Sequence, residues 1–157
     1  MSANGYHHPA DSNLKARLAQ LVDVDRTQLA QSYQRVLQEA LFSRRTTIRP
    51  NMVKQIASDE IDLFISFLQT SQEAVARGAA LQQIGLNEQP VLRMSQVTRQ
   101  FFAARLRNEE IASALEIIDA YQEQLMLGFI QSLEKEVFRV QERTRQAYER
   151  VSERERP

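Results

Sequence analysis

Apolar residues recur every three or four positions along most of this chain, a spacing that places them on one face of an α-helix. They predict a first helix from about residue 13, and a second that starts after Asp23 or Asp25 and ends near Ser43–Arg45. No segment alternates apolar and polar residues in the manner of a half-buried β-strand. The pattern therefore predicts an all-α fold.

A break at TTIRPN precedes the third predicted helix, which has Pro50 in its first turn, where proline is tolerated. We expect Asp59, Glu60 and Asp62 on the solvated side of this helix. Its buried face is predicted to hold the apolar residues at helical spacing, which are Met52, Ile56, Ile61, Phe64, Ile65 and Leu68.

Two further helices follow from capping signals. Thr70 and Glu73 have the spacing of a capping box, so a short helix is predicted after Thr70 or Ser71, ending at Gly85. The next helix is predicted between Asn87 and Asn108, and Asn108 can also cap the helix that follows.

The last third of the chain, from Glu109 to Glu155, reads as one uninterrupted helix. No proline lies between Pro90 and Pro157, and the only glycine in the run is Gly128. At ~1.5 Å per residue this helix spans roughly 70 Å, about twice the width of a small domain. The chain is thus predicted to hold six or seven helices, of which the last extends beyond its own domain.

The outer part of this helix carries one narrow apolar stripe between charged residues. Thirteen of the twenty-three residues from Glu134 to Arg156 are charged. The stripe repeats at intervals of four and three, as in a heptad, through Leu133, Val137, Val140, Thr144, Ala147 and Val151. Such a helix is stable mainly when it is paired, so we predict a dimeric coiled-coil stalk. The alternative is a single solvated helix that docks on its own domain.

The inner part of the same helix, from Ile111 to Phe129, is apolar on more than one face. We expect one face in the domain core and another, with Leu125 and Phe129, against a partner subunit. The predicted organisation is a flexible tail over residues 1–12, a helical domain over 13–132 and a coiled-coil linker helix over 133–157.

Composition limits the function. The length of 157 residues fits one domain, and 20 Lys and Arg balance 20 Asp and Glu, so the charge does not favour nucleic acid or an anionic membrane as a partner. The chain has no cysteine, which excludes disulfides and thiolate chemistry. No apolar run approaches the ~20 residues of a membrane span. We therefore expect a soluble, cytoplasmic protein.

Candidate catalytic and metal-binding groups are few. The only histidines, His7 and His8, lie in the tail, so the folded part offers no His-based triad, metal site or haem ligand. The acidic cluster around Glu60 has no histidine beside it, and a solvated helix face explains it better than metal binding or proton transfer. We predict no catalytic, cofactor-binding or metal-binding residue, and a protein that is not an enzyme.

Phenylalanines form a second candidate site. In a helical fold they can line a pocket for a small apolar ligand or simply fill the core, and the core is the better interpretation. The possible pocket residues are Phe42, Phe64, Phe67, Phe101 and Phe102.

Four segments carry a resemblance to a known family. They are DRTQLAQSYQRVLQEALFSRR, RPNMVKQIASDEIDLFISFL, GLNEQPVLRMSQVTRQFF and EKEVFRVQERTRQAYERVSERE. From Leu14 to Glu155 the chain resembles the N-terminal sensory domains of stressosome co-antagonist proteins of the RsbR type and related regulators. The resemblance implies a globin-like helical bundle without haem, which precedes a STAS, PAS or kinase module. It also implies a homodimer whose final helices run side by side into that output module, with stressosome-type proteins as partners.

The resulting hypothesis is a non-enzymatic, homodimeric sensory domain whose paired final helices relay a signal to an effector. Leu125, Phe129 and the six stripe residues are expected to form the dimer. Two alternatives stay open, namely a module that binds a small apolar ligand and a helical adaptor that docks another protein.

Overall fold

The computed structural model describes residues 9–155. Residues 1–8 of the predicted tail, with His7 and His8, lie outside them, and the first helix begins at Pro9, four residues before the predicted start. The described part of the chain forms six α-helices and no strand, which confirms the all-α prediction. The only β-type pairing recorded there is an isolated bridge between Thr46 and Leu86. The helices are α1 (Pro9–Val24), α2 (Arg26–Phe42), α3 (Val53–Thr70), α4 (Val75–Gln83), α5 (Glu88–Ala103) and α6 (Asn108–Arg154), and a 3-10 turn, η1 (Pro50–Met52), leads into α3.

Most helix ends lie close to the predicted ones. Asp25 precedes α2, Pro50 opens the turn before α3, and Gly85 ends α4 with a φ of 103° that favours glycine. Thr70, however, does not cap α4. Its hydroxyl donates to the carbonyl of Ser66 within α3, and α4 begins only at Val75. The capping-box prediction was wrong because α3 continues through Thr70.

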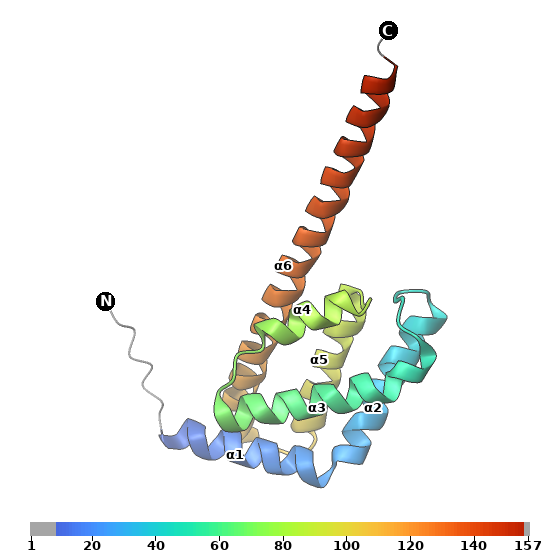
Figure 1. Ribbon diagram of the computed structural model, residues 1–157. Helices are drawn as coiled ribbons and strands as arrows, with labels where there is room; N and C mark the ends of the chain where they lie inside the picture. Colours follow the sequence, from blue (N-terminus) through green and yellow to red (C-terminus); the bar gives the residue numbers. More distant parts are fainter. Residues whose placement is uncertain (1–8, 156–157) are drawn as a thin grey trace, which may run out of the picture.

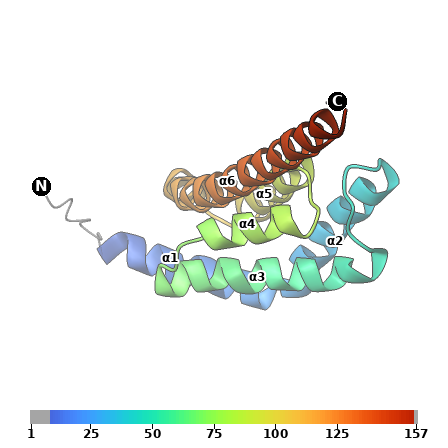
Figure 2. The same cartoon turned by 45° about the horizontal axis from the view of Figure 1, so that its top comes forward.

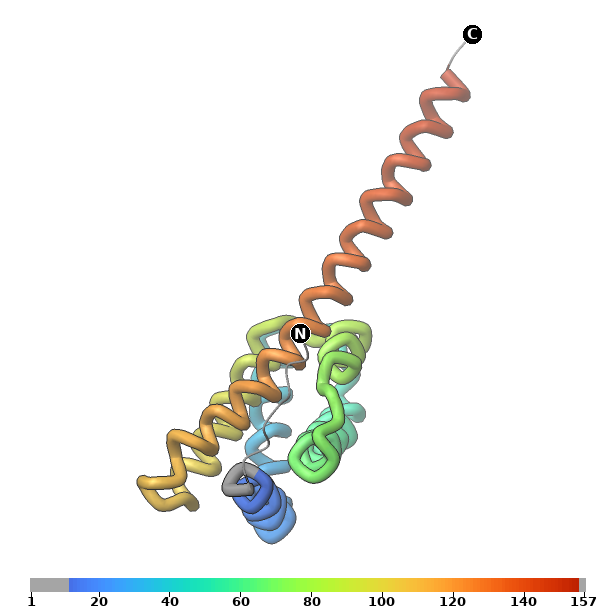
Figure 3. Tube along the Cα trace, turned by 90° about the vertical axis from the view of Figure 1, so that its left-hand side faces the viewer, coloured from blue at the N-terminus to red at the C-terminus, as the bar shows by residue number. Residues whose placement is uncertain are grey.

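The body is built around the first half of α6. Helices α4 and α5 pack along it, while α1 contacts α3 and α2 contacts both α3 and α5. Figure 2 shows α4 running between α3 and α6. Helix α6 starts near α1 and leaves the body at the opposite end (Figure 1). Its last turns extend away from every other helix, as the side view shows (Figure 3).

Two glycines let α4 and α6 approach each other closely. A Cβ atom at Gly128 would lie 1.8 Å from the carbonyl oxygen of Val75, and one at Gly78 would lie 1.8 Å from that of Leu125. Side chains at either position would collide with backbone, so the pair of glycines sets the distance between the two helices. The last turn of α4 is thereby held beside the point where α6 leaves the body.

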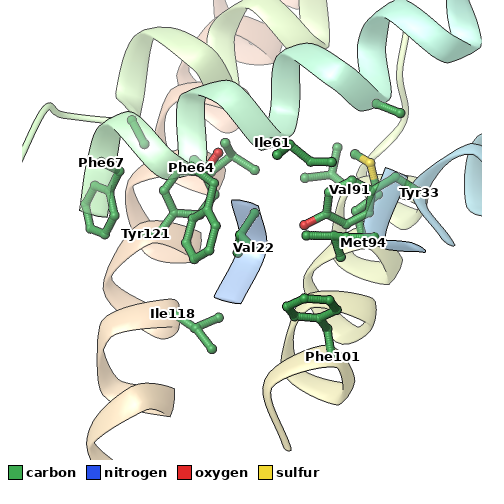
Figure 4. Packing of buried hydrophobic residues seen from close by; sticks show 14 of the residues in the cluster. Val22, Tyr33, Ile61, Phe64, Phe67, Val91, Met94, Phe101, Ile118 and Tyr121 are labelled. Atoms are coloured by element: carbon green, nitrogen blue, oxygen red, sulfur yellow. The ribbon is translucent and has the colours of Figure 1, made fainter. Parts of the chain in front are cut away.

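Aromatic residues fill the core. Phe64, Phe67 and Tyr121 lie together where α3 meets α6 (Figure 4), with the rings of Phe64 and Tyr121 4.8 Å apart. Phe101 and Phe102 pack edge to face, with ring centres 5.2 Å apart. These four phenylalanines are buried. Phe64 joins the two groups, since its ring centre lies 6.1 Å from that of Phe102.

Phe42 does not belong to this set, because its side chain is 91% exposed at the end of α2. The buried face of α2 contains Val36, Leu37 and Ala40. One residue turns a helix by about 100°, so Phe42, which follows the half-buried Leu41, is turned away from that face. Its assignment to the possible pocket was wrong.

Candidate functional site

The burial of α6 changes at Ser132. Its buried residues are Ala114, Ile117, Ile118, Tyr121, Leu125, Gly128, Phe129 and Ser132. From Leu133 to Glu155 every residue is exposed except the half-buried Glu142. We call the part from Leu133 to Arg154 the stalk. It is about 33 Å long at 1.5 Å per residue, and among the described residues its large apolar side chains expose 40% or more of their surface.

All six residues of the predicted stripe lie on the exposed stalk. Val137, Val140 and Val151 expose between 47% and 56% of their surface, which is high for valine in a folded chain. The stripe runs the length of the stalk instead of being scattered over it. Contiguous exposed apolar surface of this kind indicates a binding surface.

Leu125 and Phe129 belong to the core of their own chain. Each exposes only 2% of its surface, so neither side chain is available to a partner, and their placement in the dimer interface was wrong. Phe129 precedes Leu133 by four residues, and four residues turn a helix about 40° beyond a full turn. Going from the stalk into the body, this rotation carries Leu125 and Phe129 away from the stripe and towards the core.

The exposed stripe continues into the body through two other residues. Ile130 is 46% exposed and Met126 is partly buried. These two residues continue the alternating spacing of four and three residues towards the N-terminus of α6. The heptad spacing was therefore the signal for them that the sequence prediction missed. We call the complete set the seam. It consists of Met126, Ile130, Leu133, Val137, Val140, Thr144, Ala147 and Val151.

The ion pairs recorded within the stalk leave the seam free. Arg145 binds Glu142 at 2.6 Å and Glu149 at 2.8 Å. The hydrogen bond from Arg145 lowers the pKa of the Glu142 carboxyl below its usual value. Arg145 follows the seam residue Thr144 and points to the flank of the helix, so these pairs support the helix without covering its apolar face.

A groove lies beside the base of the stalk. It has a volume of about 720 Å³, and the seam residues Leu133, Val137 and Val140 line one side of it. The other side is formed by the end of α4 and the turn into α5, from Gln82 to Glu88. Gln82 joins the two sides, because its amide nitrogen donates to Glu136 and its amide oxygen accepts a hydrogen bond of 2.6 Å from Ser132.

A polar network lies inside the body, and its centre is Glu60. We expected this residue on the solvated side of α3, but it is 4% exposed. One carboxylate oxygen accepts a hydrogen bond from Arg77 Nε at 3.0 Å, and the other accepts one from the Tyr121 hydroxyl at 2.5 Å. Glu60 lies four residues from both Ile56 and Phe64, so helical spacing places it on the buried face. That spacing was the signal, and the acidic neighbours concealed it.

The network joins helices that are distant in the sequence. Glu60 connects α3 with Arg77 of α4 and Tyr121 of α6, while Tyr33 of α2 and Thr98 of α5 form a hydrogen bond of 2.5 Å. Burial, and then the charge of Glu60, raise the pKa of both tyrosines. Both phenols therefore stay neutral at ordinary pH and serve as hydrogen-bonding groups.

A small cavity lies between these polar residues. Tyr33, Glu60, Thr98 and Gln122 line it, and its volume is about 10 Å³, which is room for about one water molecule. The side-chain nitrogen of Gln122 is buried and has no hydrogen-bond partner among the described residues. This space is far too small for an apolar ligand.

Metal sites and membrane-spanning helices were also sought in the described part of the chain. Residues 9–155 hold no group of three or more His, Asp or Glu placed to bind a metal ion. Over the same range, every helix is too short or too polar to cross a membrane.

Comparison of the chain with protein-family models, with curated proteins and with solved structures finds no match. The resemblance to sensory domains of the RsbR type stays a prediction.

Proposed function

We propose that this chain is a non-enzymatic, cytoplasmic regulatory domain that forms a homodimer through the seam. Its paired stalks relay a change in the helical bodies to an effector, for which a STAS, PAS or kinase module is the candidate. The observation that carries this proposal is the exposed apolar seam on a helix that leaves the body. A helix with this pattern gains stability when a second helix covers the seam.

The residue types along the seam are compatible with a two-stranded parallel coiled coil. With Leu133 as heptad position d, all four a positions are β-branched, namely Ile130, Val137, Thr144 and Val151. The d positions are Met126, Leu133, Val140 and Ala147. Among parallel coiled coils, β-branched residues at a with leucine at d favour two strands, and Leu133 is the leucine among these d positions. Thr144 and Ala147 weaken the seam, so the pairing is expected to be reversible.

Charges beside the seam are compatible with the same arrangement. In a parallel pair each g residue faces the next e residue of the other helix. Glu136 then faces the partner's Gln141, and Arg150 faces the partner's Glu155, so neither contact brings like charges together. An antiparallel pair centred on Arg143 would place that arginine opposite its own copy but Glu136 opposite the partner's Arg150, so these charges are compatible with both directions.

The continuity of α6 supports a relay. One helix runs from Asn108 in the body to Arg154 at the tip of the stalk without a break. Its inner half is fixed to α4 at Gly128 and to α3 through Tyr121 and Glu60. A shift of these contacts would move the whole helix, because a helix behaves as a rigid element in such transitions.

Analytical ultracentrifugation of a seam variant tests the dimer. Changing both Val137 and Val140 to Lys places charges in the seam, and we expect the dimer to weaken at least about a hundredfold. The matched control is Phe138→Lys. Phe138 is 66% exposed and lies between the two valines, off the seam, so the control is expected to stay dimeric. A wild-type chain that sediments as a monomer, or a double variant that dimerises like the control, would refute the proposal.

A cysteine in the seam tests the relay. The chain has no native cysteine, so Val137→Cys is a single reporter. In a parallel pair the two copies meet, and their rate of disulfide formation measures the pairing. Adding Glu60→Gln inside the body is expected to change this rate at least about threefold. An unchanged rate, with the body still folded by circular dichroism, would mean that the stalk does not respond to the body.

A further inference from the structure

The groove at the base of the stalk shares a wall with the seam. Leu133, Val137 and Val140 belong to both, and the opposite wall is the turn from Gln82 to Glu88. The space between them is about 720 Å³ and is open to solvent. Any helix that covers this part of the seam must therefore lie next to the turn.

The turn is held firmly in place. The backbone N–H of Thr47 donates to the carbonyl of Gly85 at 3.0 Å, and the Thr46 hydroxyl donates to the same carbonyl at 2.9 Å. Leu86 is 3% exposed, and Gln82 is bonded to Ser132 of α6. The wall is thus already formed in the single chain, which lowers the entropy cost of binding against it.

The side of the stalk on which the turn lies can be assigned. Glu136, the stalk residue that Gln82 binds, occupies heptad position g, one residue before the seam residue Val137. In a parallel pair the g side of one helix faces the e side of the other. At the level of the groove, the e side of a second copy presents Gln141, with Glu134 two turns earlier along the helix.

Helix dimensions bring these surfaces into contact. Paired helices lie about 8–10 Å apart between axes, and a helix with its side chains is about 10–12 Å wide. A second stalk on the seam therefore extends sideways across the groove to the turn. Gln83 and Asn87 are exposed on that wall and can form hydrogen bonds with the amide of Gln141.

We propose that the groove holds the stalk helix of a second copy of this chain, so that the α4–α5 turn of one body contacts the stalk of its partner. This inference rests on the proposed homodimer. Each stalk then touches both bodies, its own through the continuous α6 and the other through the turn. A shift of α4 in one body would act directly on the partner's helix.

Cross-linking between two chains, each with one cysteine, tests the contact. Gln83→Cys and Gln141→Cys chains with different tags are mixed and treated with a short bismaleimide. A bond within one chain is impossible, and the heterodimer is recognised by its size. We expect it to form at least about ten times faster than with the control Gln72→Cys, because Gln72 is exposed in the α3–α4 loop, outside the groove.

The Val137→Cys chain separates the two proposals. If Val137→Cys forms dimers and the Gln83 and Gln141 variants react no faster than the control, the groove inference is wrong and the homodimer stands. If Val137→Cys forms no dimers, the proposed function fails and the inference fails with it.

A change of charge gives a second measurement that needs no cysteine. Gln83→Glu with Gln141→Glu in the same chain places like charges across both copies of the contact and is expected to weaken the dimer about tenfold. Gln83→Lys with Gln141→Glu is expected to dimerise more tightly than this first variant, because the lysine attracts the new carboxylate, while the repulsion between that carboxylate and the partner's Glu136 is the same in both variants. Equal dimer affinities for these two variants in sedimentation would overturn the inference.

Discussion

Replacing Glu60 by glutamine tests the buried network. The change keeps the shape of the side chain but removes its charge, which leaves the Arg77 guanidinium without its ion-pair partner. The Arg77 side chain is only 11% exposed. Breaking a buried ion pair on one side costs about 3–5 kcal/mol. Arg77 also lines an open cleft of about 240 Å³ at the surface, where it can regain some water. We therefore expect a loss near the lower limit, about 3 kcal/mol.

Urea unfolding followed by circular dichroism measures this loss. The measurement is best made in the Val137→Lys, Val140→Lys chain, where unfolding does not depend on dimer dissociation. Asp62→Asn is the matched control. Asp62 lies two residues from Glu60 and pairs with Arg26 at 2.7 Å, but its side chain is 61% exposed, so its loss is expected to cost less than about 1 kcal/mol.

A double variant shows whether charge is the cause. Replacing both Glu60 and Arg77 by leucine removes the unpaired charge and is expected to recover at least half of the stability lost in Glu60→Gln. The Tyr121 hydroxyl then loses its acceptor, so full recovery is not expected. If Glu60→Gln falls within about 1 kcal/mol of Asp62→Asn, the ion pair does not contribute to stability as we argue.

Three other changes test the close contact between α4 and α6, the buried tyrosines and the seam. Gly128→Ala is expected to lower the stability by about 2 kcal/mol in thermal melts, because its Cβ would lie 1.8 Å from the Val75 carbonyl oxygen. The control Gln131→Ala, on the exposed side of α6, should raise the stability slightly, and equal effects of the two changes would contradict the close helix contact. Above pH 10.0 the tyrosines of the unfolded chain lose phenolic protons that buried Tyr33 and Tyr121 keep in the folded chain, so the stability should fall by about 1.4 kcal/mol per pH unit for each of these two tyrosines. Tyr33→Phe should halve that slope in urea titrations at pH 10 to 11. Thr144→Val completes the apolar a positions and should tighten the dimer about tenfold in sedimentation, a result that an unpaired stalk would not show.

Local signals predicted much of the helical organisation. Proline, glycine and aspartate near Pro50, Gly85 and Asp25 mark real helix ends, and α6 runs from Asn108 to Arg154 as the lack of breakers indicated. The apolar stripe along the stalk was also predicted, because a heptad repeat needs only one helix to define it. These features depend on residues within a few positions of each other.

Errors arose where a second helix decides the environment. Leu125 and Phe129 are large apolar residues of the kind found in interfaces, but the helical turn of α6 and the position of α4 place them in the core. Glu60 looks like a solvated residue among acidic neighbours, yet Arg77 and Tyr121 from two other helices bind it. Phe42 is as apolar as the core phenylalanines but points away from them at a helix end.

The sequence alone determined that the chain is helical, where most helices begin and end, and that its last helix has a heptad stripe. These follow from backbone preferences and side-chain periodicity, which act over one or two turns. Only the tertiary structure decided which residues of α6 remain exposed, which carboxylate is buried, and that a groove lies beside the stripe. Such properties depend on contacts between residues far apart in the chain, and a local pattern does not specify those contacts.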